Sequence, residues 1–206
     1  MNTHFPSLLL GAVLALATLA GASSAFAEKA DRLKKMEIEA DKPGTVDIRN
    51  KVVTFNGNVV VTQGTMSIRA ATITVKEDAD GYQSGVASGG PGALARFRQK
   101  RDGMNEWIEG EAERIEFDGR GSKLRLLGQA TTRRLSGTEV ADQVTGAQIV
   151  YDNALETYTV SGGARAATPD NPTGRVKVEL APRKGSRAAA EAEAAQKDAG
   201  APASAP

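Results

Sequence analysis

The stretch VTFNGNVVV at residues 53–61 places apolar side chains at alternate positions on both sides of an Asn-Gly-Asn step. Alternation with a period of two predicts β-strands with one buried face, because successive side chains of a strand point to opposite faces. Gly57 lies between the two alternating halves and predicts a turn there. The stretch therefore indicates a unit of strand, glycine turn and strand.

Three weaker copies of this unit occur elsewhere in the chain. They are VASGG at residues 86–90, LRLLGQATT at 124–132 and YTVSGGA at 158–164. The landmark glycines Gly57, Gly89, Gly128 and Gly163 recur at intervals of roughly 35 residues, which is typical of stacked supersecondary units. Glycine turns are also common in any β-protein, so the repeat alone leaves both interpretations open.

Between Met36 and Leu180 the chain continues as about sixteen short alternating segments separated by Gly, Asn and Asp. No segment shows a sustained helical period. We therefore predict an all-β fold of antiparallel strands, arranged as a sandwich, a jelly roll or a β-solenoid.

The two ends of the chain differ from this pattern. Residues 1–27 contain an apolar run from Leu8 to Gly21 and then Ala25-Phe26-Ala27, which predicts a cleavable signal peptide and export. The run is about fourteen residues long, shorter than the roughly twenty that span a bilayer. Residues 183–206 are an Ala/Lys/Glu/Pro tail without large apolar side chains, and we expect this tail to be disordered.

Composition excludes several kinds of chemistry. The chain has no Cys, and its only His, His4, lies in the predicted signal peptide. Cysteine nucleophiles, histidine acid–base chemistry and the usual zinc sites are therefore excluded from the mature chain, and we expect no metal, no cofactor and no enzyme activity. A formal net charge of +1 also disfavours a nucleic-acid partner.

A cluster of carboxylates around residue 110 is the strongest candidate for acid–base chemistry. Glu109, Glu111 and Glu113 alternate with small or apolar residues such as Ile108 and Ala112, which is typical of a solvated face above a core face. The alternation then shifts by one residue, which predicts a bulge or a strand break near Glu113.

Two arginines, Arg96 and Arg98, flank Phe97 and share one face of a predicted strand. One interpretation is a solvated strand. The other is contact with phosphates of an anionic lipid headgroup near an apolar cavity. The residues do not decide between them.

The alternating apolar residues of successive strands would line one continuous interior. A dry core is the ordinary interpretation. However, Ala, Val, Thr and Gly fill many interior positions and aromatic residues are only 4% of the chain, so the interior could be under-filled. An under-filled apolar trough could accept acyl chains.

At this point the chain resembles the LptA/OstA-like family of periplasmic lipopolysaccharide-transport proteins, over about residues 36–182. The resemblance rests on IEAD at 38–41, VTFNGNVVVTQG at 53–64, IRA at 68–70, ARF at 95–97, IEGEA at 108–112, LLGQA at 126–130 and GAQIVY at 146–151. It implies a twisted β-jellyroll domain at 28–182, located in the periplasm, with an apolar groove for the lipid A acyl chains. DGRG at 118–121 departs from the family, which often continues with an apolar residue there, so the resemblance does not predict the groove floor at these residues.

The resemblance also implies partners and site residues. Such proteins bind lipopolysaccharide and stack head to tail, bridging an inner-membrane-anchored LptC-like protein and the N-terminal domain of an outer-membrane LptD-like translocon. Matching the family's lipid-contacting positions selects Met36, Ile38, Val53, Phe97 and Phe117. The apolar alternation adds as lipid-binding candidates Phe55, Val59, Ile68, Ile73, Ile115 and Leu126.

Two other functions stay open on the residues alone. One is a structural β-repeat envelope module with a dry core and no lipid cargo. The other is a carboxylate-dependent hydrolase acting on envelope polysaccharide.

Overall fold

The computed structural model describes residues 31, 33–101, 104–183 and 185–199. The predicted signal peptide at 1–27 lies outside the described residues. The strands are β1 (Met36–Glu39), β2 (Lys42–Asp47), β3 (Val52–Gln63), β4 (Met66–Glu77), β5 (Gln83–Ser88), β6 (Ala95–Lys100), β7 (Glu106–Ala112), β8 (Arg114–Asp118), β9 (Lys123–Ser136), β10 (Glu139–Asp152), β11 (Thr157–Ser161) and β12 (Lys177–Leu180). A short 3-10 turn, η1 (Ala164–Ala166), and a helix, α2 (Arg187–Ala199), complete the described elements.

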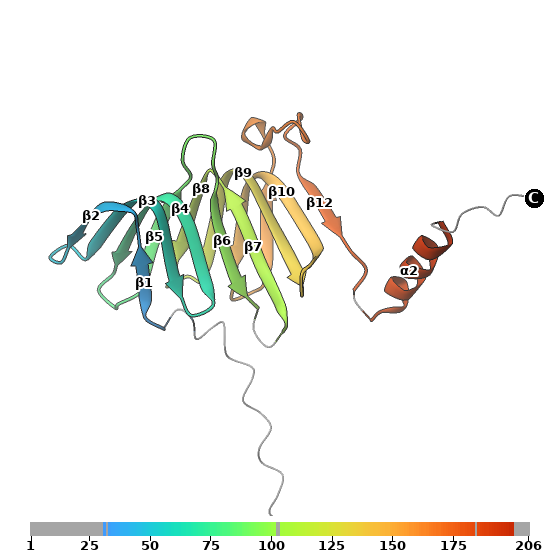
Figure 1. The fold of residues 1–206 in the computed structure, drawn as a ribbon, viewed down its shortest axis with the longest axis horizontal. Helices are drawn as coiled ribbons and strands as arrows, with labels where there is room; N and C mark the ends of the chain where they lie inside the picture. Colours follow the sequence, from blue (N-terminus) through green and yellow to red (C-terminus); the bar gives the residue numbers. More distant parts are fainter. Residues whose placement is uncertain (1–30, 32, 102–103, 184, 200–206) are drawn as a thin grey trace, which may run out of the picture.

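These twelve strands form one antiparallel sheet, which confirms the all-β prediction. The long strands β3, β4, β9 and β10 pair with different neighbours in their two halves, so the sheet divides lengthwise into two walls. The β1 wall contains β1, β6, β7 and β12, and the β2 wall contains β2, β5, β8 and β11, each with half of every long strand. Figure 1 shows the strands side by side along the long axis, from β2 at one end to β12 at the other.

The long strands bend where they pass from one wall to the other. In β3 the residues Gly57 and Asn58 face a single residue of β4, and both have a left-handed backbone, with φ of 78° and 46°. Gly128 and Gln129 form the same two-against-one bulge between β9 and β10, with φ of 76° and 45°. Such bulges bend a strand and increase its twist.

The bulges correct two predictions. Gly57 and Gly128 do not form turns, because the chain continues in the same direction through each of them. Four pairs of predicted short strands are therefore four long strands, and the sheet has twelve strands instead of about sixteen. A glycine between two alternating segments looks the same in a turn and in a bulge, and only the register with the neighbouring strand separates them.

The carboxylate-rich segment behaves as predicted. β7 ends one residue before Glu113 and β8 begins one residue after it, which confirms a strand break. Ile108 and Ala112 are buried, whereas Glu109 and Glu111 lie on the opposite face and are half-buried. These carboxylates pair with arginines of neighbouring strands. The segment is therefore a charged outer face above a core face.

One apolar cluster fills the space between the walls along the whole sheet. Its larger members with an exposure of 1% or less are Val59, Val61, Ile68, Ile73, Ile115, Leu126 and Ile149. The members toward the two ends are only partly buried, namely Met36, Ile38, Val53 and Phe55 near β1 and β2, and Val144, Tyr158 and Val160 near β11 and β12. The interior is therefore tightly packed in the middle and open at both ends.

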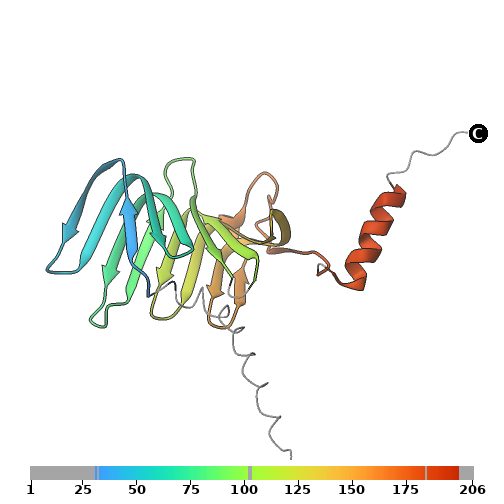
Figure 2. The same ribbon diagram turned by 60° about the horizontal axis from the view of Figure 1, so that its bottom comes forward.

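The tail differs from the expected disorder, because Arg187–Ala199 forms α2. Figures 1 and 2 show this helix standing apart from the strands. Its alanines have the highest intrinsic helix propensity, and Arg187 pairs with Glu191 one turn later at 2.7 Å. Local propensity thus accounts for the helix. Among the described residues, none of the helices is both long and apolar enough to cross a membrane.

Arg120 joins two turns of the β2 wall. Its guanidinium donates hydrogen bonds to Asp78, at 2.9 Å, and to Asp80. Burial acts to raise the pKa of Asp78, but hydrogen bonds from Arg120 and from the backbone N–H groups of Tyr82 and Asp80 outweigh it. The pKa of Asp78 therefore lies below its ordinary value.

Removing this guanidinium should make the chain less stable in a pH-dependent way. An ionised Asp78 stabilises the folded state above its unfolded pKa, and this stabilisation is lost as the pH falls through the lowered folded pKa. We expect Arg120→Gln to lower the urea midpoint near pH 7 and to differ much less from the unchanged chain near pH 2. An equal deficit at both pH values would show that the Asp78 carboxylate is not the partner that matters.

Gly85 should be intolerant of a side chain. It lies directly opposite Phe117 in the β5–β8 pair, and a Cβ there would lie 2.6 Å both from the Phe117 ring and from the carbonyl oxygen of Thr74. We expect Gly85→Ala to lower the free energy of unfolding by about 1–3 kcal/mol, measured by denaturant titration, because overpacking displaces the ring. Ser84→Ala, on the other face of β5, is the matched control and should change stability by less than about 0.5 kcal/mol.

Candidate functional site

At the edge of the sheet opposite the bends, no strand of the described residues connects the two walls, and we call it the open edge. The turns after β3, β6 and β9 come from the β1 wall, and the turns after β2, β4, β8 and β10 come from the β2 wall. Side-chain contacts between described residues cross this edge at two places. Gln63 Nε2 donates to Oε1 of Gln83 at 3.1 Å, and Arg101 Nη2 donates to Oε2 of Glu156 at 2.6 Å.

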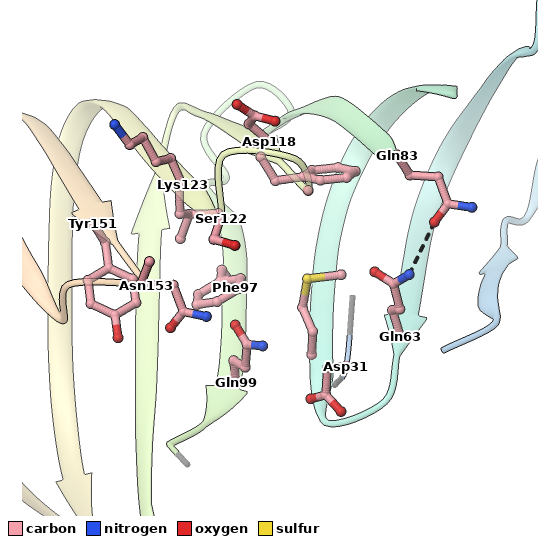
Figure 3. Close-up of a pocket in the computed structure, with 15 residues that line it drawn as sticks. Asp31, Gln63, Gln83, Phe97, Gln99, Asp118, Ser122, Lys123, Tyr151 and Asn153 are labelled. Atoms are coloured by element: carbon pink, nitrogen blue, oxygen red, sulfur yellow. Dashed lines mark hydrogen bonds between the residues drawn. The ribbon is translucent and has the colours of Figure 1, made fainter. Parts of the chain in front are cut away.

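A cavity of about 240 Å³ opens at this edge, and we call it the first cavity. Its apolar floor consists of Met66, Phe97, Phe117, Leu124 and Tyr151. Its rim is polar and includes Gln63, Gln83, Gln99, Lys123 and Asn153. Figure 3 shows Gln63 and Gln83 joined on one side of the cavity and Tyr151 and Asn153 on the other. An apolar floor below a polar rim suits a molecule with apolar chains and a polar head.

The DGRG segment that departs from the family pattern belongs to the rim of this cavity. Asp118 and Gly119 line it. The Gly119 N–H donates to the carbonyl oxygen of Gln83 at 3.0 Å, and a Cβ at Gly119 would lie 2.4 Å from that oxygen. The glycine therefore allows two turns of the β2 wall to approach each other, and the apolar floor stops at Phe117.

The predicted lipid-binding residues all belong to the interior cluster, but they fall into three groups. Phe97 and Phe117 line the first cavity. Met36, Ile38, Val53 and Phe55 are partly buried at the β1–β2 end. Val59, Ile68, Ile73, Ile115 and Leu126 are buried in the closed centre, where they pack against one another.

The cavity also contains residues that the prediction omitted. Met66 lies two positions before Ile68 on the same face of β4, so the alternation already pointed to it. Leu124 and Tyr151 alternate with interior residues in the same way. The polar rim gave no such signal, since a Gln at a strand end has no pattern that assigns it to a particular edge.

A second cavity, of about 200 Å³, lies next to the first, and Tyr151 lines both. Its apolar lining is Ile108, Val144, Tyr151 and Tyr158, and its charged lining is Arg101, Arg134, Asp142 and Glu156. Tyr151 and Tyr158 stack with ring centroids 4.7 Å apart. This cavity thus combines aromatic and aliphatic surface with two guanidinium groups.

The charged residues of the second cavity form a chain of ion pairs. Arg134 contacts Asp142 and Glu106, each at 2.6 Å. Glu106 also accepts a hydrogen bond from Arg101 at 2.5 Å, and Arg101 reaches Glu156 at 2.6 Å. The chain therefore begins in the β1 wall and ends across the open edge in the β2 wall.

This network keeps both guanidinium groups charged. For Arg101, burial lowers the pKa, but hydrogen bonds to Glu156 and Glu106 outweigh burial and raise it above its ordinary value. For Arg134, the hydrogen bond to Asp142 is the largest influence and raises the pKa. Arg101 is 16% exposed and Glu156 is 47% exposed, so the two partners differ in their access to water.

Arg96 and Arg98 lie outside the groove. They occupy the face of β6 opposite the buried Phe97, and they pair with Glu111 at 3.9 Å and Glu109 at 3.0 Å. The Arg98 guanidinium also lies 4.3 Å from the ring centroid of Trp107. The solvated-strand interpretation therefore describes these arginines better than contact with a headgroup at the groove mouth.

Comparisons with known proteins agree with one another. A family model described as "LptA/(LptD N-terminal domain) LPS transport protein" matches residues 37–157. The lipopolysaccharide export system protein LptA of Escherichia coli K12 is 31% identical over 155 residues, which cover 75% of this chain and 81% of that protein. The export system protein LptH of Pseudomonas aeruginosa is 26% identical over 172 residues, covering 84% and 93%.

A solved structure shows the same fold. The crystal structure of LptH, the LptA homologous periplasmic component of the conserved lipopolysaccharide transport device from Pseudomonas aeruginosa, aligns with a TM-score of 0.61 and 24% identity. The alignment covers 74% of this chain and 99% of that chain. This likeness confirms the predicted LptA/OstA-like jellyroll. With the family model and the Escherichia coli relative, it leads to one conclusion: the chain belongs to the LptA/(LptD N-terminal domain) family of lipopolysaccharide transport proteins.

Proposed function

We propose that this chain is a periplasmic lipopolysaccharide carrier that shields lipid A acyl chains between its two walls. The observation that carries the proposal is the first cavity, whose floor of Met66, Phe97, Phe117, Leu124 and Tyr151 continues into the interior apolar cluster. Its polar rim lies at the open edge, where a sugar headgroup would stay in water while the chains are buried. The family membership and the periplasmic relative support the same cargo and compartment.

The energy of chain burial is large enough for such a carrier. Removing one CH₂ from water contributes about 0.8 kcal/mol, so one twelve-carbon chain contributes roughly 9 kcal/mol. The first cavity, at about 240 Å³, is below the range of about 300–1,000 Å³ usual for small-molecule sites. A lipid with several acyl chains therefore requires the walls to separate at the open edge. Separation there breaks the Gln63–Gln83 and Arg101–Glu156 contacts and parts the apolar floor, while the bends hold the other edge.

The ends of the sheet suit end-to-end assembly. At the β1–β2 end, Val46 is 58% exposed and pairs with the partly buried Val53. At the β12 end, Val178 is 52% exposed and pairs with the partly buried Val144. Both exposed residues thus extend the interior face, and an unpaired edge strand is a template for another chain. Stacked copies would form a continuous apolar path from an LptC-like protein to an LptD-like translocon.

Photo-crosslinking tests the lipid groove directly. A photoreactive residue placed at Phe117 should label strongly with lipopolysaccharide, because Phe117 lines the cavity. The matched control is Glu116, the preceding residue on the opposite face of β8. Labelled adduct is measured by immunoblot after irradiation. Equal labelling at the two positions would refute the lipid groove. It would favour the alternative function, a structural module with a dry core, which the tightly packed centre of the interior supports.

Light scattering over a concentration series tests the assembly. The mature chain should form particles that grow with concentration, and Val178→Lys should suppress that growth, since it places a charge on the interior face at the exposed end. Glu179→Lys adds positive charge to the other face of the same strand and should leave growth nearly unchanged. If both variants suppress particle growth equally, the suppression is a general effect of charge. That outcome would contradict a continuous apolar path between copies.

A further inference from the structure

The chain of ion pairs at the second cavity has an unusual arrangement for a structural network. Four of its members, Asp142, Arg134, Glu106 and Arg101, are 16–25% exposed and belong to the β1 wall or to the residue directly after β6. Only the last member, Glu156, lies across the open edge, and it is 47% exposed. Glu106 therefore holds the Arg101 side chain from the β1 wall. The Nη2 atom of Arg101 donates to the Glu156 carboxylate, which is accessible to water.

The Arg101 side chain also lies next to the apolar lining of the second cavity. It lines the second cavity together with Ile108, Tyr151 and Tyr158, and Tyr151 connects this cavity to the first. A lipid whose chains entered either cavity would place its headgroup at the open edge, which is where the Arg101 guanidinium lies. The guanidinium is the side-chain group best suited to bind a phosphate through two parallel hydrogen bonds.

We propose that Arg101 binds a phosphate group of the lipid headgroup, and that Glu156 occupies the same position in the empty protein. This inference rests on the proposed lipid-carrying function. One phosphate replaces one Glu156 carboxylate, so Arg101 has a negatively charged partner both before and after the exchange. Glu106 stays in place during the exchange, because Arg134 also holds it.

The exchange is energetically reasonable in both directions. An ion pair with a half-exposed partner contributes little to stability, because water solvates the released carboxylate. A phosphate group carries up to two negative charges shared by its oxygens and offers a bidentate geometry, so it competes well for the same guanidinium. Releasing Glu156 also removes a contact that crosses the open edge, so headgroup binding and wall separation occur together.

The other basic residues fit this role less well. Arg134 is held by two carboxylates of its own wall. Lys123 lines the first cavity, but it pairs with Asp152 at 3.5 Å and presents a point charge rather than a fork. Arg98 lies on the outer face of β6 and therefore serves as the matched control for any change of arginine.

The test compares two lipids and four variants of the mature chain. Equilibrium binding is measured for lipid A with two phosphates and for the same lipid with one phosphate removed. The unchanged chain should prefer the first lipid by roughly tenfold, the effect expected of charged hydrogen bonds. Arg101→Gln should abolish that preference, and Arg101→Lys should restore it in part. Glu156→Gln should widen it, because the competing carboxylate is gone. Arg98→Gln should leave it unchanged.

The outcomes separate this inference from the proposed function. If the unchanged chain binds neither lipid, the proposed function fails, and the inference fails with it. If both lipids bind and Arg101→Gln keeps the full preference, only the inference is overturned. If Arg101→Gln and Glu156→Gln change the affinity for both lipids in the same direction, the pair is merely a clasp between the walls. Inorganic phosphate alone, if it displaces the lipid completely, would identify a free-anion site instead.

Discussion

The rest of this structure depends on one constraint at the strand bends: two residues of one strand face a single residue of the neighbouring strand. Gly57 and Asn58 in β3, and Gly128 and Gln129 in β9, adopt left-handed backbones that let a continuous strand change walls. The neighbouring strands β4 and β10 use a single residue at the same place, so their interior positions change from even to odd numbers, as from Ile68 to Ile73 in β4 and from Val144 to Ile149 in β10. Because of this offset, apolar side chains from both halves of every strand face the same interior.

The resulting interior is closed by backbone at one edge and by side chains at the other, and this difference matters for the entry of a ligand. Bends close one edge with continuous backbone, so the centre behind them is packed at 1% exposure or less. The described contacts across the open edge are between side chains, which can exchange partners without breaking the sheet. Protein regions with few buried apolar contacts are the ones that open most easily. The jellyroll therefore separates a part that keeps the fold intact from a part that can admit a ligand.

Alternation in the sequence was sufficient to predict the strands and most interior residues, including Phe97 and Phe117 at the cavity. It was also sufficient at Glu113, where the parity shift predicted the strand break. The same shift from even to odd interior positions occurs between Ile68 and Ile73 and was visible in the sequence. However, a turn at Gly57 explained the alternating segments before it equally well. The open edge could not be predicted, because which turn faces which depends on pairing between distant strands. Arg101 and Glu156 lie 55 positions apart, and no local pattern connects them.

The position of Trp107 gives the chain an internal spectroscopic reporter. It is the only tryptophan of the sequence, and it lies on the outer face of the β1 wall beneath the Arg98 guanidinium. Its indole is thus separated from the interior by the sheet itself. Tryptophan fluorescence, excited selectively over that of the tyrosines, will follow the loss of the β6–β7 pairing while remaining nearly silent to what enters between the walls. Unfolding and loading can therefore be recorded independently in one sample, the first from the indole emission and the second from a labelled lipid.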